Sequence, residues 1–143
     1  MIHFDYYQRT KGKGRALLNY TTGELTFLDG SRLWAHMPAV EVNERLAAAR
    51  DRDWALLPRP VAGGEITPVC LLRDGALCGV WLYASQPGAK AEKQRAFLLK
   101  RLQLRDPCPD TLGCFRVQCP FGEVDVSTDP YTGQAAALIR YRA

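Results

Sequence analysis

The side chains best suited to binding chemistry gather between residues 90 and 105. Six cations stand there against one acid, Glu92, so this stretch carries a local charge of +5. On a helix turning about 100° per residue, most of these cations fall on one side, and Phe97 projects from that side too. An aromatic ring among cations can fill a pocket of a protein partner or stack on a nucleic-acid base. The candidate partner-binding residues here are Lys90, Lys93, Phe97, Lys100, Arg101 and Arg105.

A plainer interpretation of the same segment stays open beside the functional one. Phe97 then packs beneath the C-terminal strands, which is the commoner use of an aromatic side chain. The cations form a solvated rim around it. Leu104 is expected to project from the same side as Phe97, whereas Ala91, Leu98, Leu99 and Leu102 form the stripe that faces the sheet.

A second candidate binding element is the glycine-rich segment at residues 11–15, where Lys11, Lys13 and Arg15 are the cations. A flexible turn can hold a phosphate backbone through its amides and these side chains. The spacing of a nucleotide-binding P-loop is absent, and no helix is predicted to follow. The alternative is a hairpin tip that its lysines keep soluble.

Metal chemistry is not predicted, although the chain has five cysteines. No Cys-x-x-Cys pair occurs, so the usual zinc knuckle is missing. Cys108, Cys114 and Cys119 are the set that could gather around an ion, and Cys70 and Cys78 are expected to act as small apolar residues. We predict no metal and no cofactor.

Catalysis is not predicted either. A nucleophilic cysteine needs a base within reach, and the histidines are His3 and His36 alone. No local motif joins either of them to a cysteine. Paired carboxylates, a Gly-x-Ser-x-Gly elbow, a His-Glu-x-x-His motif and a dinucleotide fingerprint are all missing from the sequence. We therefore expect no catalytic residues.

The N-terminal half must supply a sheet and one helix. Alternating apolar residues and turn signals predict a four-stranded antiparallel meander within the first 35 residues. A helix is predicted over residues 38–52, with Pro38 at its start and Val42, Leu46 and Ala49 on one face. Residues 55–64 are predicted to form a loop because they are rich in proline and glycine.

The second half must position the basic segment. Asp74-Gly75 predicts a hairpin with strands at residues 66–73 and 76–84, because both residues of a type I′ turn need positive φ. The nearly continuous apolar residues of these strands predict burial on both faces, at the centre of the sheet. We expect the basic helix over residues 87–104, followed by strands at 114–119, 123–127 and 135–141.

These elements predict one α+β domain over residues 1–143. A mostly antiparallel sheet of about seven to nine strands is packed by the two helices, at residues 38–52 and 87–104. Trp34, Trp54 and Trp81 are assigned to the core or to helix–sheet packing.

Composition limits the functional classes. The chain has 143 residues, 47% of them hydrophobic, and no apolar run approaches the roughly 18 residues of a membrane span. An odd number of cysteines and no predicted secretory signal favour a cytoplasmic protein. Arginine outnumbers lysine 14 to 5, a bias typical of GC-rich bacteria and their phages or plasmids.

The net charge of +4 combines two opposing blocks. Residues 106–129 hold five acids against Arg116 and so carry a local charge of −4, directly after the basic segment. Such polarity favours a protein partner of complementary charge. A decoy that imitates DNA is excluded, since it would need a strongly acidic surface.

We therefore expect a non-catalytic module that binds a protein partner, such as an inhibitor or accessory factor of a host complex. The alternative is direct nucleic-acid binding through the helix at residues 90–105 together with Lys11, Lys13 and Arg15. A Cys/His enzyme or metal site is the second alternative. The oligomeric state is left open.

Overall fold

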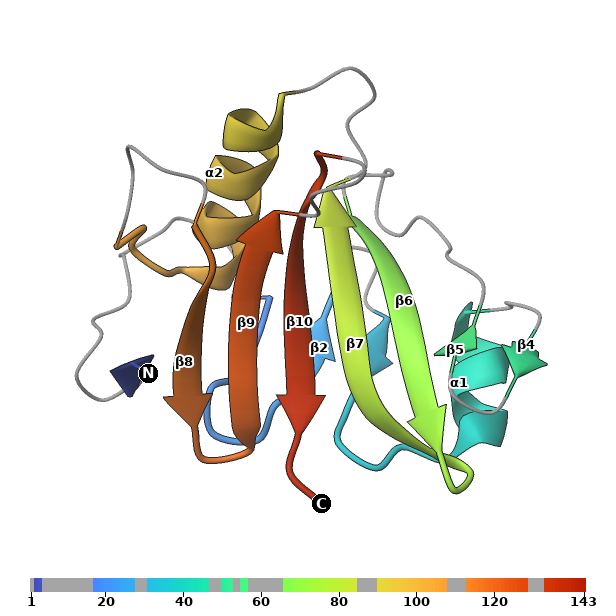
Figure 1. Cartoon of the computed structure of the whole chain (residues 1–143). Helices are drawn as coiled ribbons and strands as arrows, with labels where there is room; N and C mark the ends of the chain where they lie inside the picture. Colours follow the sequence, from blue (N-terminus) through green and yellow to red (C-terminus); the bar gives the residue numbers. More distant parts are fainter. Residues whose placement is uncertain are drawn as a thin grey trace.

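The fold is described from a computed structural model. It describes residues 2–3, 17–27, 31–46, 50–52, 55–56, 66–84, 90–107, 113–128 and 133–143, with the backbone alone at 2–3, 43–46, 50–52 and 55–56. The predicted α+β class is confirmed: a mostly antiparallel main sheet is packed by two helices (Figure 1). Among the described residues, six strands form the main sheet, and four more form two separate two-stranded ribbons.

The main sheet has the strand order β1-β8-β9-β10-β7-β6. All neighbours are antiparallel except β1, which runs parallel to β8. The last strand along the chain, β10, therefore lies in the middle and joins the two hairpins. The bounds are β1 Ile2–His3, β6 Ile66–Arg73, β7 Ala76–Ala84, β8 Phe115–Cys119, β9 Gly122–Thr128 and β10 Ala135–Tyr141.

The hairpin of β6 and β7 has the bounds predicted from the sequence. Asp74 and Gly75 both have positive φ, 52° and 77°, as the predicted turn requires. The predicted place of this hairpin was wrong, because β6 is the edge strand of the main sheet and β7 is its neighbour. Burial on both faces was wrong too: the residues of β6 alternate between buried and half-buried.

The predicted meander is confirmed only in part: residues 25–26 pair antiparallel with 32–33, and Leu18 forms an isolated antiparallel bridge with Leu25. Ile2–His3 joins the main sheet beside β8, while β2 (Leu25–Thr26) and β3 (Arg32–Leu33) form a ribbon of their own. The Tyr141 hydroxyl donates a hydrogen bond to the Gly23 carbonyl at 2.8 Å, which ties the turn before this ribbon to β10. The middle of the predicted meander, residues 4–16, lies outside the described residues.

The first helix, α1, is shorter than predicted. It spans Ala39–Leu46, and the segment Arg50–Arg52 is a strand, β4, paired with β5 (Ala55–Leu56). The prediction of a helix to residue 52 was therefore wrong, as was the prediction of a loop beginning at residue 55. Charged residues 50–53 offer no apolar side chain to continue the stripe of the helix.

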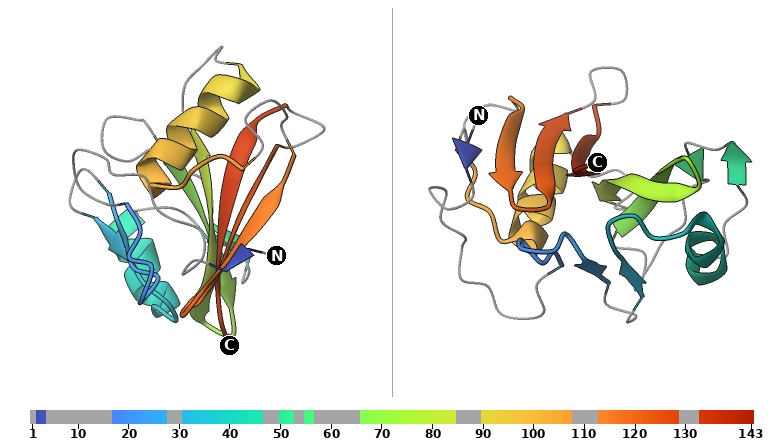
Figure 2. Two further views of the ribbon diagram at one scale, coloured as in Figure 1. Left: turned by 90° about the vertical axis from the view of Figure 1, so that its left-hand side faces the viewer. Right: turned by 90° about the horizontal axis from the view of Figure 1, so that it is seen from below.

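The elements form two layers. The second helix, α2 (Ala91–Leu102), packs on β7 and β10, and the ribbon of β2 and β3 lies on the same side of the main sheet (Figures 1 and 2). Most buried apolar side chains of the described part form one cluster between these layers, whereas Ala136 and Leu138, which are also buried, do not belong to it. The opposite face, which carries Trp81, Tyr83, Asp125 and Arg140, is covered by no described helix; it is the open face.

Candidate functional site

The helix α2 is the element that presents the predicted binding residues. Leu98, Leu99 and Leu102 are buried against the sheet, as the stripe predicts. The helix ends at Leu102 because Gln103 adopts a left-handed conformation, with φ 57°. The chain then turns inward and buries Leu104, which is 2% exposed. The expectation that Leu104 projects from the basic side was therefore wrong.

Arg95 is a buried cation that holds α2 in place. Its side chain is 2% exposed, and its Nε and Nη2 atoms donate to the two Asp106 carboxylate oxygens at 2.9 and 2.8 Å. Its Nη1 atom donates to the Gly113 carbonyl, and its guanidinium carbon lies 5.6 Å from the centre of the Phe115 ring. Arg95 thus joins the helix to the segment after it and to β8, and its charge is not offered to a partner.

Two further hydrogen bonds attach α2 to the rest of the fold. The side chain of Gln94 is buried, and its Oε1 atom accepts a hydrogen bond from the backbone N–H of Ala135 at 2.9 Å. The Tyr20 hydroxyl donates to the carbonyl of Leu102 at the end of the helix. Because α2 is attached along its whole length, its outward residues hold a fixed spacing.

The outward side of α2 carries most of the predicted site. Four of the predicted cations are exposed: Lys90, Lys93, Lys100 and Arg105. Arg101 and Phe97 are half-buried, and Phe97 packs against the core. Phe97 is therefore an apolar residue at the margin of the cations rather than a freely projecting anchor. We call Lys90, Lys93, Lys100 and Arg105 the basic face.

The acidic block after α2 is not a free acidic surface. Three of its acids are in ion pairs with arginines. Asp106 pairs with Arg95, Asp125 with Arg116 at 3.1 Å, and Glu123 with Arg140 at 3.1 Å. The other two acids of the block, Asp110 and Asp129, lie outside the described residues. Within the described part, the predicted contrast between a basic and an acidic block therefore remains mainly as the exposed cations of the basic face.

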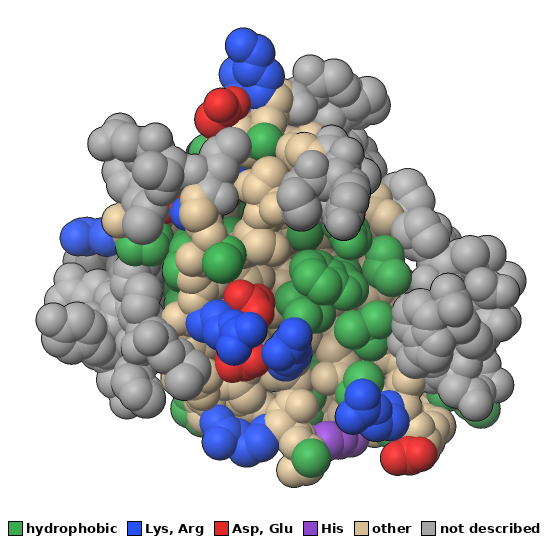
Figure 3. All heavy atoms as spheres, viewed as in Figure 1, with side chains coloured by type: hydrophobic (Ala, Val, Ile, Leu, Met, Phe, Trp, Pro, Cys, Tyr) green, Lys and Arg blue, Asp and Glu red, His purple; other side chains and the backbone are tan. Residues whose placement is uncertain are grey.

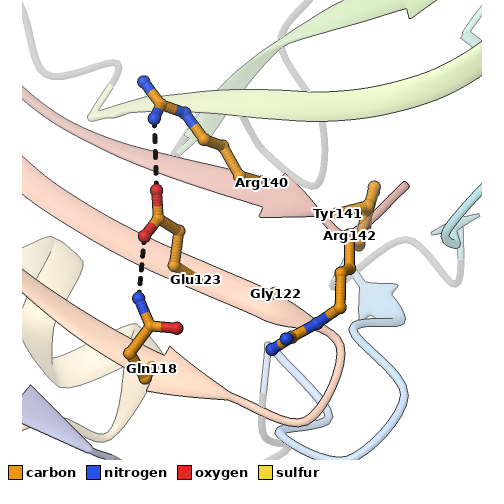
Figure 4. A pocket seen from close by; sticks show the side chains of 6 residues that line it. All are labelled: Gln118, Gly122, Glu123, Arg140, Tyr141 and Arg142. Carbon is orange, nitrogen blue, oxygen red and sulfur yellow. Dashed lines mark hydrogen bonds and ion pairs between the residues drawn. The ribbon is translucent and has the colours of Figure 1, made fainter.

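The ion pairs of Asp125 and Glu123 lie on the open face of the main sheet, beside a patch of apolar side chains (Figure 3). At the lower end of this face is a hollow of about 260 Å³ lined by Gln118, Gly122, Glu123, Arg140, Tyr141 and Arg142 (Figure 4).

The Glu123 carboxylate accepts from Gln118 at 2.9 Å as well as from Arg140, and Arg142 donates to the Cys119 carbonyl. These polar groups already form hydrogen bonds within the protein. The hollow is also smaller than the 300–1,000 Å³ typical of ligand sites, so it is a weak candidate for a small-molecule site.

Three of the four described thiols are buried or donate to backbone carbonyls, which does not favour nucleophilic chemistry. Cys70 is buried, and this burial raises the pKa of its thiol to about 12, so the reactive thiolate is scarce near neutral pH. The thiols of Cys78 and Cys119 donate to backbone carbonyls of Leu71 and Val117. Cys114 is exposed.

No metal-binding cluster occurs among the residues described: nowhere in those ranges do three His, Cys, Asp or Glu side chains gather as ligands. Cys108, which belongs to the set considered from the sequence, lies outside them. His36 is exposed, and the side chain of His3 is not among those described. Nor does any described helix have the length and apolar character needed to cross a membrane.

The turn with Lys11, Lys13 and Arg15 also lies outside the described residues, so its place relative to the basic face stays a prediction. No protein-family model matches this chain, and comparisons with curated proteins and with solved structures find no significant match. The interpretation of the site therefore depends on its own geometry.

Proposed function

We propose that this protein is a non-catalytic binding module that docks an acidic segment of a protein partner onto the outward side of α2. The observation that carries the proposal is the basic face: Lys93 and Lys100 are exposed on α2, Lys90 directly before it and Arg105 three residues after it, with Glu92 as the acid beside them. The attachments of Arg95, Gln94 and Leu102 support it because they hold the helix before a partner arrives.

Two properties of α2 favour binding: the helix is already held in place, and exposed cations lie on and beside it. A helix already held in its bound position loses little conformational entropy on binding. A group of exposed cations attracts an acidic partner, so it accelerates the approach of that partner and orients it. The accessible part of Phe97 adds apolar contact area at the margin of the basic face, where a protein partner can bury it.

Nucleic acid is the second candidate, and the same four cations favour it. Proteins that bind a nucleic-acid strand usually have a stripe of cations that runs along the strand and extends over several elements. The 12 residues of α2 span only about 18 Å. On the open face, Arg116 and Arg140 are in ion pairs with acids. A compact positive patch suits an acidic protein segment better.

The biological setting is part of the proposal. We infer a cytoplasmic protein, and the four described cysteines, which are free thiols, support a reducing compartment. A small binding module of this kind can act as an inhibitor or accessory factor that occupies an acidic surface of a larger complex.

Binding of two labelled probes of equal charge, an oligoglutamate peptide and an oligodeoxythymidine, tests the proposal by fluorescence anisotropy. We expect the peptide to bind the wild type and to bind the double variant Lys93→Glu/Lys100→Glu about tenfold more weakly, which is about 1.4 kcal/mol. The matched control is Arg32→Glu/Arg73→Glu, which reverses two exposed arginines elsewhere and should bind as the wild type does.

Equal peptide binding by all three proteins, or none by the wild type, would overturn the proposal. Tighter binding of the oligonucleotide, with a steep loss of affinity as salt rises, would replace it with the nucleic-acid function.

A further inference from the structure

The open face of the main sheet carries two neighbouring aromatic side chains. Trp81 and Tyr83 lie two residues apart on β7, so both stand on this face. Their rings stack with centres 6.1 Å apart and planes at 27°. Both side chains are half-buried, and no described helix covers them (Figure 3). Aromatic area left in contact with water on a sheet face indicates an interaction surface.

The same face carries polar groups that hold one another in place. Figure 4 shows the Glu123 carboxylate between Gln118 and Arg140, which donate to it at 2.9 and 3.1 Å. Arg116 and Asp125 form a second ion pair, at 3.1 Å. A guanidinium and a carboxylate each have more donor or acceptor positions than one ion pair uses. This part of the face therefore offers both donors and acceptors at fixed positions.

The hollow at the lower end of the face lies close to the aromatic pair. Arg140 lines the hollow and lies diagonally across from Trp81, because the register pairs Trp81 with Leu138, two residues before Arg140. Diagonal neighbours on adjacent strands are roughly 7–8 Å apart. The hollow is small for a whole ligand, but it can hold one unit of a chain whose next units lie over Trp81.

The charges of this face favour a ligand that has no net charge. Three arginines and two acids lie there, so neither sign dominates: Arg116, Arg140, Arg142, Glu123 and Asp125. A phosphate strand is attracted by the arginines but repelled by both carboxylates, and a basic segment meets the reverse. A neutral ligand uses the donors and the acceptors alike.

A neutral sugar chain has the surface that such a face would recognise. Each sugar ring has an apolar side made of C–H groups, which can pack flat on an aromatic ring. Each of its hydroxyl groups both donates and accepts hydrogen bonds, so it can bond to a guanidinium, an amide or a carboxylate. Sheet faces of other folds bind oligosaccharides in this general manner.

We propose that the open face binds a neutral oligosaccharide. Its rings pack on Trp81 and Tyr83, and its hydroxyl groups form hydrogen bonds with Arg140, Glu123 and Gln118 at the hollow. Because ion pairs and hydrogen bonds already hold these polar groups, they lose little freedom on binding. The inference does not depend on the function proposed for α2, which lies on the opposite layer.

NMR titration of the backbone amide signals tests the proposal. The neutral probes are maltohexaose, cellohexaose and N-acetylchitohexaose, and hexadeoxythymidine is the charged probe. The open-face variants are Trp81→Ala and Arg140→Ala. Circular dichroism first establishes that each variant is folded, and Arg140→Ala, which replaces an exposed side chain, decides the outcome if Trp81→Ala does not fold. The matched control is Lys93→Glu on α2.

We expect at least one hexasaccharide to bind the wild type and Lys93→Glu equally, to shift the signals of β7 and β10, and to bind the folded open-face variants about tenfold more weakly. The proposal is overturned if no hexasaccharide binds the wild type at millimolar concentration, or if the folded open-face variants bind as the wild type does. Tighter binding of hexadeoxythymidine than of every sugar would replace the oligosaccharide with a nucleic-acid strand.

Discussion

A buried guanidinium needs partners for its charge and its donors, and Arg95 finds them within a short segment of chain. Asp106 supplies a carboxylate, Gly113 a carbonyl and Phe115 a ring face. These three residues follow the helix in sequence, so the contacts fix the course of the chain from α2 to β8. Arg95, together with Gln94 and the Leu102 carbonyl, holds α2 and so fixes the positions of its exposed cations.

Replacing Arg95 with alanine should destabilise the fold by about 3 kcal/mol, because loss of one partner leaves a partly buried charge uncompensated. Urea unfolding measures the difference. The control is Arg105→Ala on the basic face, which is exposed and should change the free energy of unfolding by less than about 0.5 kcal/mol. Equal effects of the two substitutions would contradict the role given to Arg95.

The helical pattern predicted most of this residue-level picture. The outward positions of Lys90, Lys93 and Lys100 follow from the spacing of the leucine stripe alone. Arg95 was counted only as part of the basic segment, although it lies three residues before Leu98 and four before Leu99, on the buried stripe. An arginine on such a stripe requires an acid, but helical spacing does not indicate that this acid is Asp106.

At the scale of elements, local signals were reliable and long-range pairing was not. The bounds of β6, β7 and β10 follow from turn residues such as Asp74 and Gly75, which act within a few residues. The order of strands depends instead on contacts between distant segments: β10 pairs with β7, and β1 with β8. Periodicity contains no information on such partners, and so β6 was expected at the centre although it is an edge strand.

Two buried side chains that keep their protons in the folded state should make the free energy of unfolding fall at alkaline pH. Burial raises the pKa of Cys70 on β6 from 9.0 to about 12 and raises that of Tyr141 on β10 above its ordinary 10.0, helped by the nearby Cys70 and Glu24. Above pH 9.0 the unfolded chain releases protons that the folded chain keeps. Stability is thus fully present below that pH and falls above it, by up to about 1.4 kcal/mol per pH unit for each proton.

Urea unfolding between pH 9.0 and 10.0 measures this dependence, since Cys70 titrates first in the unfolded chain. The Cys70→Ala variant removes the thiol and with it one of the two protons, so its stability should fall less steeply with rising pH than that of the wild type. The same slope in both proteins would show that Cys70 is not the group responsible.

As a whole, the molecule has two different faces. One layer presents the exposed cations of α2, and the other presents the apolar strands and compensated charges of the open face (Figures 2 and 3). The net charge of +4 therefore gives little idea of what a partner meets. A partner that approaches α2 meets exposed cations, whereas one that approaches the open face meets apolar strands and the ion pairs of Arg116 and Arg140.

The function proposed for the basic face is that it binds a protein. Quantitative affinity capture from a nuclease-treated lysate of a GC-rich bacterium tests it most directly, with the wild type, Lys93→Glu/Lys100→Glu and Arg32→Glu/Arg73→Glu as baits. We expect acidic proteins that the wild type and the arginine control capture equally and that the α2 variant captures at least tenfold less. Identical captured proteins for all three baits would contradict it.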